Sequence, residues 1–458
     1  MKFKFCILVF FAACVSVFGA AQSVDMDRLS RTAVGVGFIF ETEQGSVRQN
    51  VVASVLDAGG LAILEPNAIP EFVRPKNIKD LKVFYRGDDD GIPAEFLGFD
   101  PIYGFNFIKI KAPLPAGIVP LSSIKRAKAA LGARVFGFER SSIETNMHIS
   151  YMESYVMSII EGDAPRFLSR AGLCELGSAA FDADSALVGI GVGGFGEDCD
   201  ICASSSDNFR AYIVSTSARM FIDADAVYQI ASRFLKDPKL ENVGWIGIGN
   251  LSVVKKSAAK MMGVENSAAI SAGDVIKNSP ADKAGLKSGA IFVSVNGKPL
   301  ASYDYPQETL LNFTSTVATT PPGGKIVFEV LDGGGKKTVS VDVAKHPKRL
   351  NQTESKYFKK LGFSIREFIM DDAFKHRILD ADAQGAVVEI VEPNGPADSG
   401  DDSALVPGHL LVEINSAPVR TYAQAVQMLE AAQKSSSEIT LLVSEINQTK
   451  LVRIKADK

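Results

Sequence analysis

The chain has 458 residues, a net charge of −4 and 22% charged residues. A length of this order predicts about three domains, and the 46% of hydrophobic residues is ordinary for a globular protein. The weakly acidic balance and the lack of a basic stripe argue against binding to nucleic acid.

The first 21 residues have the organisation of a secretory signal peptide. A short basic start precedes an apolar run over residues 5–18, and small residues follow. The apolar run is too short for a comfortable transmembrane helix, so we expect an exported chain. An alternative interpretation takes residues 11–14 as a loose lipobox, which would make Cys14 a lipid-anchored N-terminus.

Short segments rich in β-branched and aromatic residues, separated by turns, continue from about residue 32 to residue 213. The expected strands are residues 34–40, 51–56, 61–64, 81–85, 94–99, 105–111, 133–138, 150–160, 186–192 and 211–215. Many short strands with regular turns predict a β-barrel or sandwich. Residues 223–234 are predicted as the first long helix because their apolar residues recur with helical spacing.

Cys174, Cys199 and Cys202 follow the signal peptide, and the last two form a CxxC motif. This motif would serve as a redox dithiol or as half of a zinc site. The alternative is a disulfide in a surface loop, with Cys174 joined to one of the pair. No second CxxC or His pair completes a metal set, so we expect neither a metal nor a cofactor.

Residues 279–297, SPADKAGLKSGAIFVSVNG, are the most distinctive stretch of the chain. A Ser-Pro start, an Ala-rich turn and an alternating strand lead to an Asn-Gly hairpin turn. Residues 394–415, NGPADSGDDSALVPGHLLVEIN, repeat this order with extra polar residues at 399–403. The repeat predicts two copies of one domain, each with a later helix, at residues 307–314 and 422–432.

Both stretches resemble the core of a PDZ domain of the HtrA/DegP type, which reads SPA-x-x-AGL-x-x-GD before its strand. Ala290 and His409 stand where that family has Asp. Residues 81–111 and 181–190 resemble the hairpin and strand patterns of the family's trypsin-like domain. The resemblance implies a mainly β fold, with a trypsin-like double β-barrel followed by two α+β PDZ domains. Expected boundaries are 30–238 for the double barrel, 243–345 for the first α+β domain, 346–356 for a linker and 357–456 for the second α+β domain.

The resemblance also implies where a protease of this type would carry its catalytic Ser, His and Asp. Matching the family's motifs puts the His position at Asn67, the Asp position at Gly104 and the nucleophile position at Leu176. None of these residues can perform the role of the one it replaces, and Cys174 replaces a glycine that shapes the oxyanion loop. We therefore expect a pseudoprotease. The alternative is an active serine endopeptidase with Ser178 as its nucleophile.

A PDZ domain binds a peptide as an added strand at a sheet edge and holds its carboxylate in an apolar-Gly-apolar loop. The matching residues are Trp245, Ile246, Gly247 and Ile248 in the first copy and Leu361, Gly362 and Phe363 in the second. Since such triplets are common in strands, a purely structural role is the alternative. The expected partners are peptide segments or C-termini of other envelope proteins, bound by a scaffold, adaptor or chaperone-like factor of the bacterial periplasm or cell envelope.

Relatives of the HtrA type often form trimers through the N-terminal segment of the barrel. Residues 26–34 contain no aromatic residue, which argues against that contact in this chain. A homo-oligomer of another kind stays open.

Overall fold

The computed structural model describes residues 25–42, 45–66, 68–70, 73–85, 90–111, 113–140, 148–170, 172–193, 220–264, 267–331, 335–398, 404–435, 438–445 and 448–455. The predicted signal peptide with Cys14, the expected strand 211–215, Asn67, Cys199 and Cys202 lie outside these residues. The pairing of the three later cysteines therefore stays a prediction. Within the described ranges, no helix is long and apolar enough to cross a membrane.

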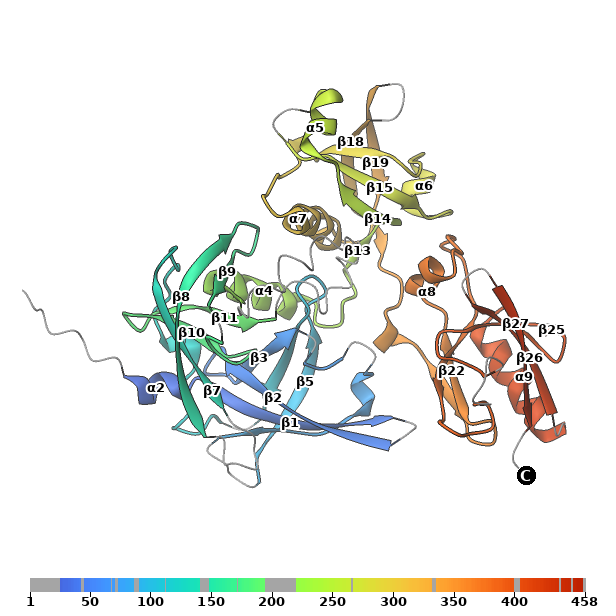
Figure 1. The fold of residues 1–458 in the computed structure, drawn as a ribbon, viewed down its shortest axis with the longest axis horizontal. Coiled ribbons are helices and arrows are strands. Elements are labelled where there is room, and N and C mark those ends of the chain that lie inside the picture. The colour runs from blue at the N-terminus through green and yellow to red at the C-terminus, as the bar shows by residue number, and fades with distance from the viewer. Residues whose placement is uncertain are drawn as a thin grey trace, which may run out of the picture.

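Two closed six-stranded barrels form the N-terminal half of the molecule (Figure 1). The first has the strand order β1-β2-β3-β6-β5-β4 and the second β10-β11-β12-β9-β8-β7. The first comprises β1 Ala33–Thr42, β2 Gly45–Val55, β3 Leu61–Pro66, β4 Ile78–Phe84, β5 Ile92–Phe99 and β6 Phe105–Ile110. The second comprises β7 Arg134–Arg140, β8 Ile149–Ile160, β9 Arg166–Ser169, β10 Ala179–Asp182, β11 Leu187–Val192 and β12 Met220–Asp223. The predicted double barrel is confirmed.

Short helices and one long helix complete this half. They are α2 Met26–Ser30, the 3₁₀ turns Pro75–Asn77 and Leu121–Ser123, and α4 Ala224–Lys236. Helix α4 begins where expected because the Asp223 carboxylate caps it by accepting from the Ala226 amide at 3.1 Å. Its Phe234 ring stacks on Phe107 of β6 at 4.4 Å, so the helix packs against the first barrel as well as the second.

The C-terminal half holds two α+β domains (Figure 1). The first contains β13 Gly244–Trp245, β14 Ile248–Val253, α5 Lys256–Met261, β15 Ile270–Val275, α6 Pro280–Lys283, β16 Ile291–Val295, β17 Lys298–Pro299, α7 Pro306–Thr319, β18 Lys325–Leu331, β19 Lys336–Asp342 and β20 Ala344–Lys345. A 3₁₀ turn, Leu350–Gln352, precedes the second. That domain contains β21 Ser355–Phe358, β22 Phe363–Glu367, α8 Met370–Lys375, β23 Ala386–Val391, β24 Leu410–Ile414, β25 Ala417–Pro418, α9 Tyr422–Ser435, β26 Glu438–Glu445 and β27 Gln448–Lys455.

The two domains repeat one topology. The first sheet runs β14-β15-β16-β18-β19 with β17 beside β16, and the second runs β22-β23-β24-β26-β27 with β25 beside β24. The predicted hairpin turn is present, since Asn296 and Gly297 have φ of +50° and +75°. The second sheet has one further strand, β21, next to β22. Ser355 and Lys356, which the sequence placed in the linker, are therefore part of that sheet.

Two buried ion pairs hold the domains to the barrels. Arg166 of β9 pairs with Glu308 of α7, whose side chain is 1% exposed. Burial raises the pKa of Glu308, and the charge of Arg166 opposes that rise. On the other side, Arg74 lies 2.8 Å from Glu389 of β23 and donates through Nε to the Thr353 carbonyl at 2.7 Å. Both domains are therefore docked through charges that are largely out of water.

Candidate functional site

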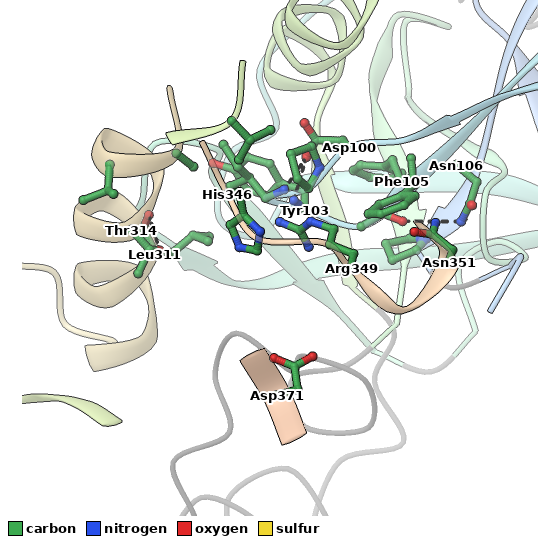
Figure 2. A pocket seen from close by; sticks show the side chains of 18 of the residues that line it. Asp100, Tyr103, Phe105, Asn106, Leu311, Thr314, His346, Arg349, Asn351 and Asp371 are labelled. Carbon is green, nitrogen blue, oxygen red and sulfur yellow. Dashed lines mark hydrogen bonds between the residues drawn. The ribbon is translucent and has the colours of Figure 1, made fainter. Parts of the chain in front are cut away.

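A cavity of about 470 Å³ lies where the double barrel, the first α+β domain and the linker meet. Its wall contains two of the positions matched to a catalytic triad, Gly104 and Leu176, and the whole predicted peptide loop, Trp245, Ile246, Gly247 and Ile248. Figure 2 shows the labelled side chains of α7, the linker and the barrel that face it. The third triad position, Asn67, is outside the described residues.

Gly104 ends a tight turn that begins at Asp100. The Asp100 carboxylate accepts from the amides of Ile102 at 3.1 Å and Tyr103 at 2.6 Å, and from Arg233 of α4 at 2.6 Å. The Gly104 amide donates to the Asp100 carbonyl at 2.9 Å, and its φ of +74° favours glycine. The turn is thus built around Asp100, and its last residue offers no carboxylate to the cavity.

Asn106 of β6 contacts both the end of β3 and the turn at Gly104. Its Nδ2 lies 3.3 Å from the Glu65 carbonyl at the end of β3 and 3.4 Å from the Gly104 carbonyl. The side chain is 1% exposed, and its Oδ1 has no partner among the described residues. The Asn106 side chain therefore links the residues just before Asn67, the position matched to the His, with Gly104, the position matched to the Asp.

The loop around Leu176 rests against both barrels. Ser54 of β2 donates to the Gly177 carbonyl at 2.7 Å. Cys174 is buried, and a Cβ added at Gly137 or at Gly191 would lie 2.6 Å from its Cβ or 2.7 Å from its Sγ. The two glycines make room for the cysteine, so the loop packs around a side chain at a place where the family motif has none.

Ser178, the alternative nucleophile, lies beneath this loop. Its side chain is 1% exposed, its amide donates to the Glu175 carbonyl at 3.0 Å and its carbonyl accepts from Gly191 at 2.8 Å. Ser178 is not among the described residues that line the cavity. This geometry disfavours Ser178 as a nucleophile.

No serine or cysteine is among the described residues that line the cavity. Thr314 is the one hydroxyl of the Ser or Thr type there, and it donates to the Leu310 carbonyl of its own helix at 3.0 Å. His148, the one histidine between the signal peptide and α4, is exposed at the start of β8 and does not line the cavity. The described wall therefore offers no nucleophile paired with a base.

His346 lines the cavity and was missed by sequence reasoning because it lies in the predicted linker. Its Nδ1 is 2.8 Å from the Pro347 carbonyl. Burial, helped by the charge of Arg349, lowers the pKa of His346 to about 4. The imidazole is therefore neutral at pH 7, and in Figure 2 it faces the cavity between α7 and Tyr103.

This lowered pKa predicts acid sensitivity at the cavity wall. The contribution of His346 to stability is fully present above about pH 6.5 and is lost as the pH falls toward its folded-state pKa of about 4. The loss should reach up to about 3 kcal/mol. His346→Gln should flatten the fall in thermal stability between pH 7 and pH 4.5, whereas His148→Gln at an exposed site should not. Equal slopes for both variants would contradict this assignment.

In the predicted peptide loop of the first domain, two backbone amides have no described acceptor. Gly247 has φ of +82°, and the carbonyls of Ile246 and Gly247 accept from the amides of Ala281 at 2.8 Å and Ile276 at 2.9 Å. Among the described residues, nothing accepts a hydrogen bond from the Ile246 or Gly247 amides. These donors are suited to a carboxylate.

A groove continues from this loop between β14 and α7. Ile248 and Leu251 of β14 and Leu311 and Val317 of α7 line it. Strand β14 pairs with β15 on one side, and along its length its residues are half-buried or exposed, as expected of a sheet edge. The groove is part of the cavity that reaches Leu176 and Gly104.

The corresponding loop of the second domain has the predicted shape but a different setting. Gly362 has φ of +68°, and its carbonyl accepts from the Glu392 amide at 2.7 Å, as Gly247 accepts from Ile276. Leu361 and Phe363 are each 0% exposed. They belong to the core of their domain, as Ile246, at 1% exposed, does in the first domain.

Known proteins share parts of this chain. The family model described as PDZ domain matches residues 272–310. A "probable periplasmic serine endoprotease DegP-like" of Chlamydia trachomatis is 26% identical over 185 residues, which are 40% of this chain and 34% of that protein. A protein of the same description from Brucella suis is 25% identical over 272 residues, 59% of this chain and 47% of its own length. The chain thus spans about a third to a half of the curated relatives it matches.

Solved structures support the same fold. An HtrA-type protease AlgW in complex with a tripeptide superimposes with a TM-score of 0.50 and 16% identity, covering 70% of this chain and 96% of that one. At this identity the likeness concerns the fold alone.

Proposed function

Because the chain belongs to the HtrA/DegP-like serine endoprotease family with a PDZ domain, we propose that it is an exported, catalytically inactive member that binds peptide C-termini. The clients would be envelope proteins, as the periplasmic relatives suggest. The observation that carries the proposal is the composition of the cavity wall. The wall contains the Ile246 and Gly247 loop of the first α+β domain together with Gly104 and Leu176, the positions matched to a catalytic Asp and Ser.

Polar side chains form part of this wall. Besides Asn106 Oδ1, the buried Gln307 Oε1 and Asn351 Oδ1 have no partner among the described residues, and all three residues line the cavity. Buried amide oxygens are normally hydrogen-bonded, but these three are out of contact with solvent, so a peptide would reach them only after the side chains move. Arg349 adds a positive charge to the same wall, which favours a ligand that ends in a carboxylate.

Incubation of the purified mature chain with unfolded casein tests the absence of catalysis. We expect no cleavage above the buffer blank and no labelling by a serine-directed phosphonate, because the described cavity wall carries no serine or cysteine. Ser178→Ala and Thr314→Ala should behave identically. Cleavage that disappears in either variant would establish the alternative, an active serine endopeptidase with a rearranged site.

Peptide binding is tested with dye-labelled hexapeptides that end in Val, Ile, Leu or Phe. Each is compared with the same peptide amidated at its C-terminus. We expect binding of the free acids at micromolar concentration and at least tenfold weaker binding of the amides, because amidation removes the charge that the Ile246 and Gly247 amides would hold. Equal binding of acids and amides would contradict recognition of a C-terminus.

A further inference from the structure

The edge of the second sheet differs from the edge of the first. Strand β22 pairs with β23 on one side and with β21 on the other. Four of its five residues are buried, whereas its counterpart β14 is half-buried or exposed throughout. The edge at which a PDZ domain adds a peptide strand is therefore free in the first domain and filled in the second.

Strand β21, which fills this edge, ends at the place where a bound peptide would have to end. In the antiparallel register, Ser355 lies opposite Arg366, and Phe358 lies opposite Phe363, the first residue after the loop. A ligand whose carboxylate is held by the loop must likewise finish beside the start of β22. Strand β21 thus has the placement of a ligand as well as its pairing.

Phe358 lies where the C-terminal residue of a bound peptide would lie, with respect to both its side chain and its carbonyl group. Its side chain is 2% exposed within the domain core, with its ring 6.0 Å from that of Phe363. Its carbonyl accepts from the amides of Leu361 at 2.9 Å and Gly362 at 3.0 Å. These are the loop amides that would hold a carboxylate, and their counterparts in the first domain have no described acceptor.

Helix α9 closes the other side of the strand. Lys356 of β21 forms an ion pair with Glu430 of α9, and its ammonium group lies 5.9 Å from the Phe358 ring centroid. A peptide in a PDZ groove lies between the edge strand and this helix. Strand β21 therefore meets both walls of the groove.

We propose that residues 355–358 are an internal ligand that occupies the peptide site of the second α+β domain. The inference rests on the proposed peptide-binding function and deepens it. The first domain is the site open to clients, and the second accepts a peptide only after β21 has left. The peptide that fits its groove ends in an aromatic residue and carries a basic residue two positions earlier, as Lys356-Tyr357-Phe358 does.

The test uses the full mature chain and a dye-labelled free peptide with the chain's own sequence, TESKYF, which ends at Phe358. Phe358→Ala removes the buried anchor of β21. Val243→Ala, four residues before Gly247 as Phe358 is before Gly362, is the matched control. We expect binding of TESKYF in Phe358→Ala to be at least tenfold tighter than in wild type or in Val243→Ala. Adding Gly362→Ala should abolish the gain.

Hydrogen–deuterium exchange of the wild-type chain tests the same point without a ligand. All amides of residues 363–367 should be protected, and about half of them should exchange at least tenfold faster in Phe358→Ala. If that variant unfolds the second domain, Lys356→Glu, which opposes Glu430 without touching the core, replaces it in both arms.

Two results would overturn the proposal. One is wild-type binding of TESKYF that is as tight as in the variant and is lost with Gly362→Ala. The other is exchange of alternate β22 amides as fast as at the open edge of β14. A failure of peptide binding in the first domain would show in the hexapeptide assay and would leave the exchange pattern of β22 unchanged.

Discussion

Gly247→Ala should weaken the binding of C-terminal peptides to the first α+β domain at least tenfold. The glycine has φ of +82°, and an added Cβ would lie 2.1 Å from the Ser279 Cβ and 2.4 Å from its Oγ. Relief of this clash must move the loop and its Ile246 and Gly247 amides. We expect the affinity for free-acid hexapeptides to fall at least tenfold, which corresponds to about 1.4 kcal/mol, as measured by fluorescence anisotropy.

Gly285→Ala is the matched control for this change. Gly285 has the same φ of +82° but nothing within 4 Å of the added Cβ. It carries the left-handed strain alone, about 1–2 kcal/mol of folding stability, and should leave peptide affinity unchanged. If the two variants lose affinity equally, the loss comes from general destabilisation of the domain and the assigned loop is wrong.

Arg74→Ala should release the second α+β domain from the first barrel. Arg74 is 7% exposed. It pairs with Glu389 and donates to both the carbonyl and the hydroxyl of Thr353, at 2.7 Å and 3.0 Å. Removing one partner leaves Glu389 buried without its counter-charge, which costs about 3–5 kcal/mol. Because the second domain has its own core, we expect loss of docking and an increased radius of gyration in small-angle scattering.

Arg134→Ala serves as the control for the docking variant. Arg134 forms a well-aligned pair with Glu153, but the two side chains are 55% and 30% exposed. Exposed pairs contribute little to stability, so the radius of gyration and the thermal unfolding of this variant should match those of wild type. An unchanged radius in Arg74→Ala would mean that other contacts hold the domain in place.

Local patterns predicted most of the fold. The alternating barrel strands, helix α4 and the Asn296-Gly297 hairpin turn follow from nearby residues alone. Strands β9, β10 and β12 were missed because each has four residues and is defined by its neighbours in the barrel. The pairing of β21 was missed for a similar reason, since Ser355 and Lys356 are polar and their partner strand lies beyond a turn.

The candidate site was predictable residue by residue but not as an assembly. Motif spacing identified Gly104, Leu176 and the loop at Gly247, which the structure brings to one cavity. It could not identify His346, whose role depends on the linker folding back against the barrel. The burial of Ser178 likewise depends on how the Leu176 loop packs, and local sequence patterns do not predict that packing.

The contact between Arg74 and Thr353 links docking of the second domain to occupancy of its groove, because Glu354 alone separates Thr353 from β21. A peptide that displaces β21 would also weaken the contact of Thr353 with Arg74. Thermodynamic reciprocity then requires that the factor by which docking weakens peptide affinity equal the factor by which peptide weakens docking. A high concentration of client C-termini would therefore favour the undocked second domain and a more extended chain.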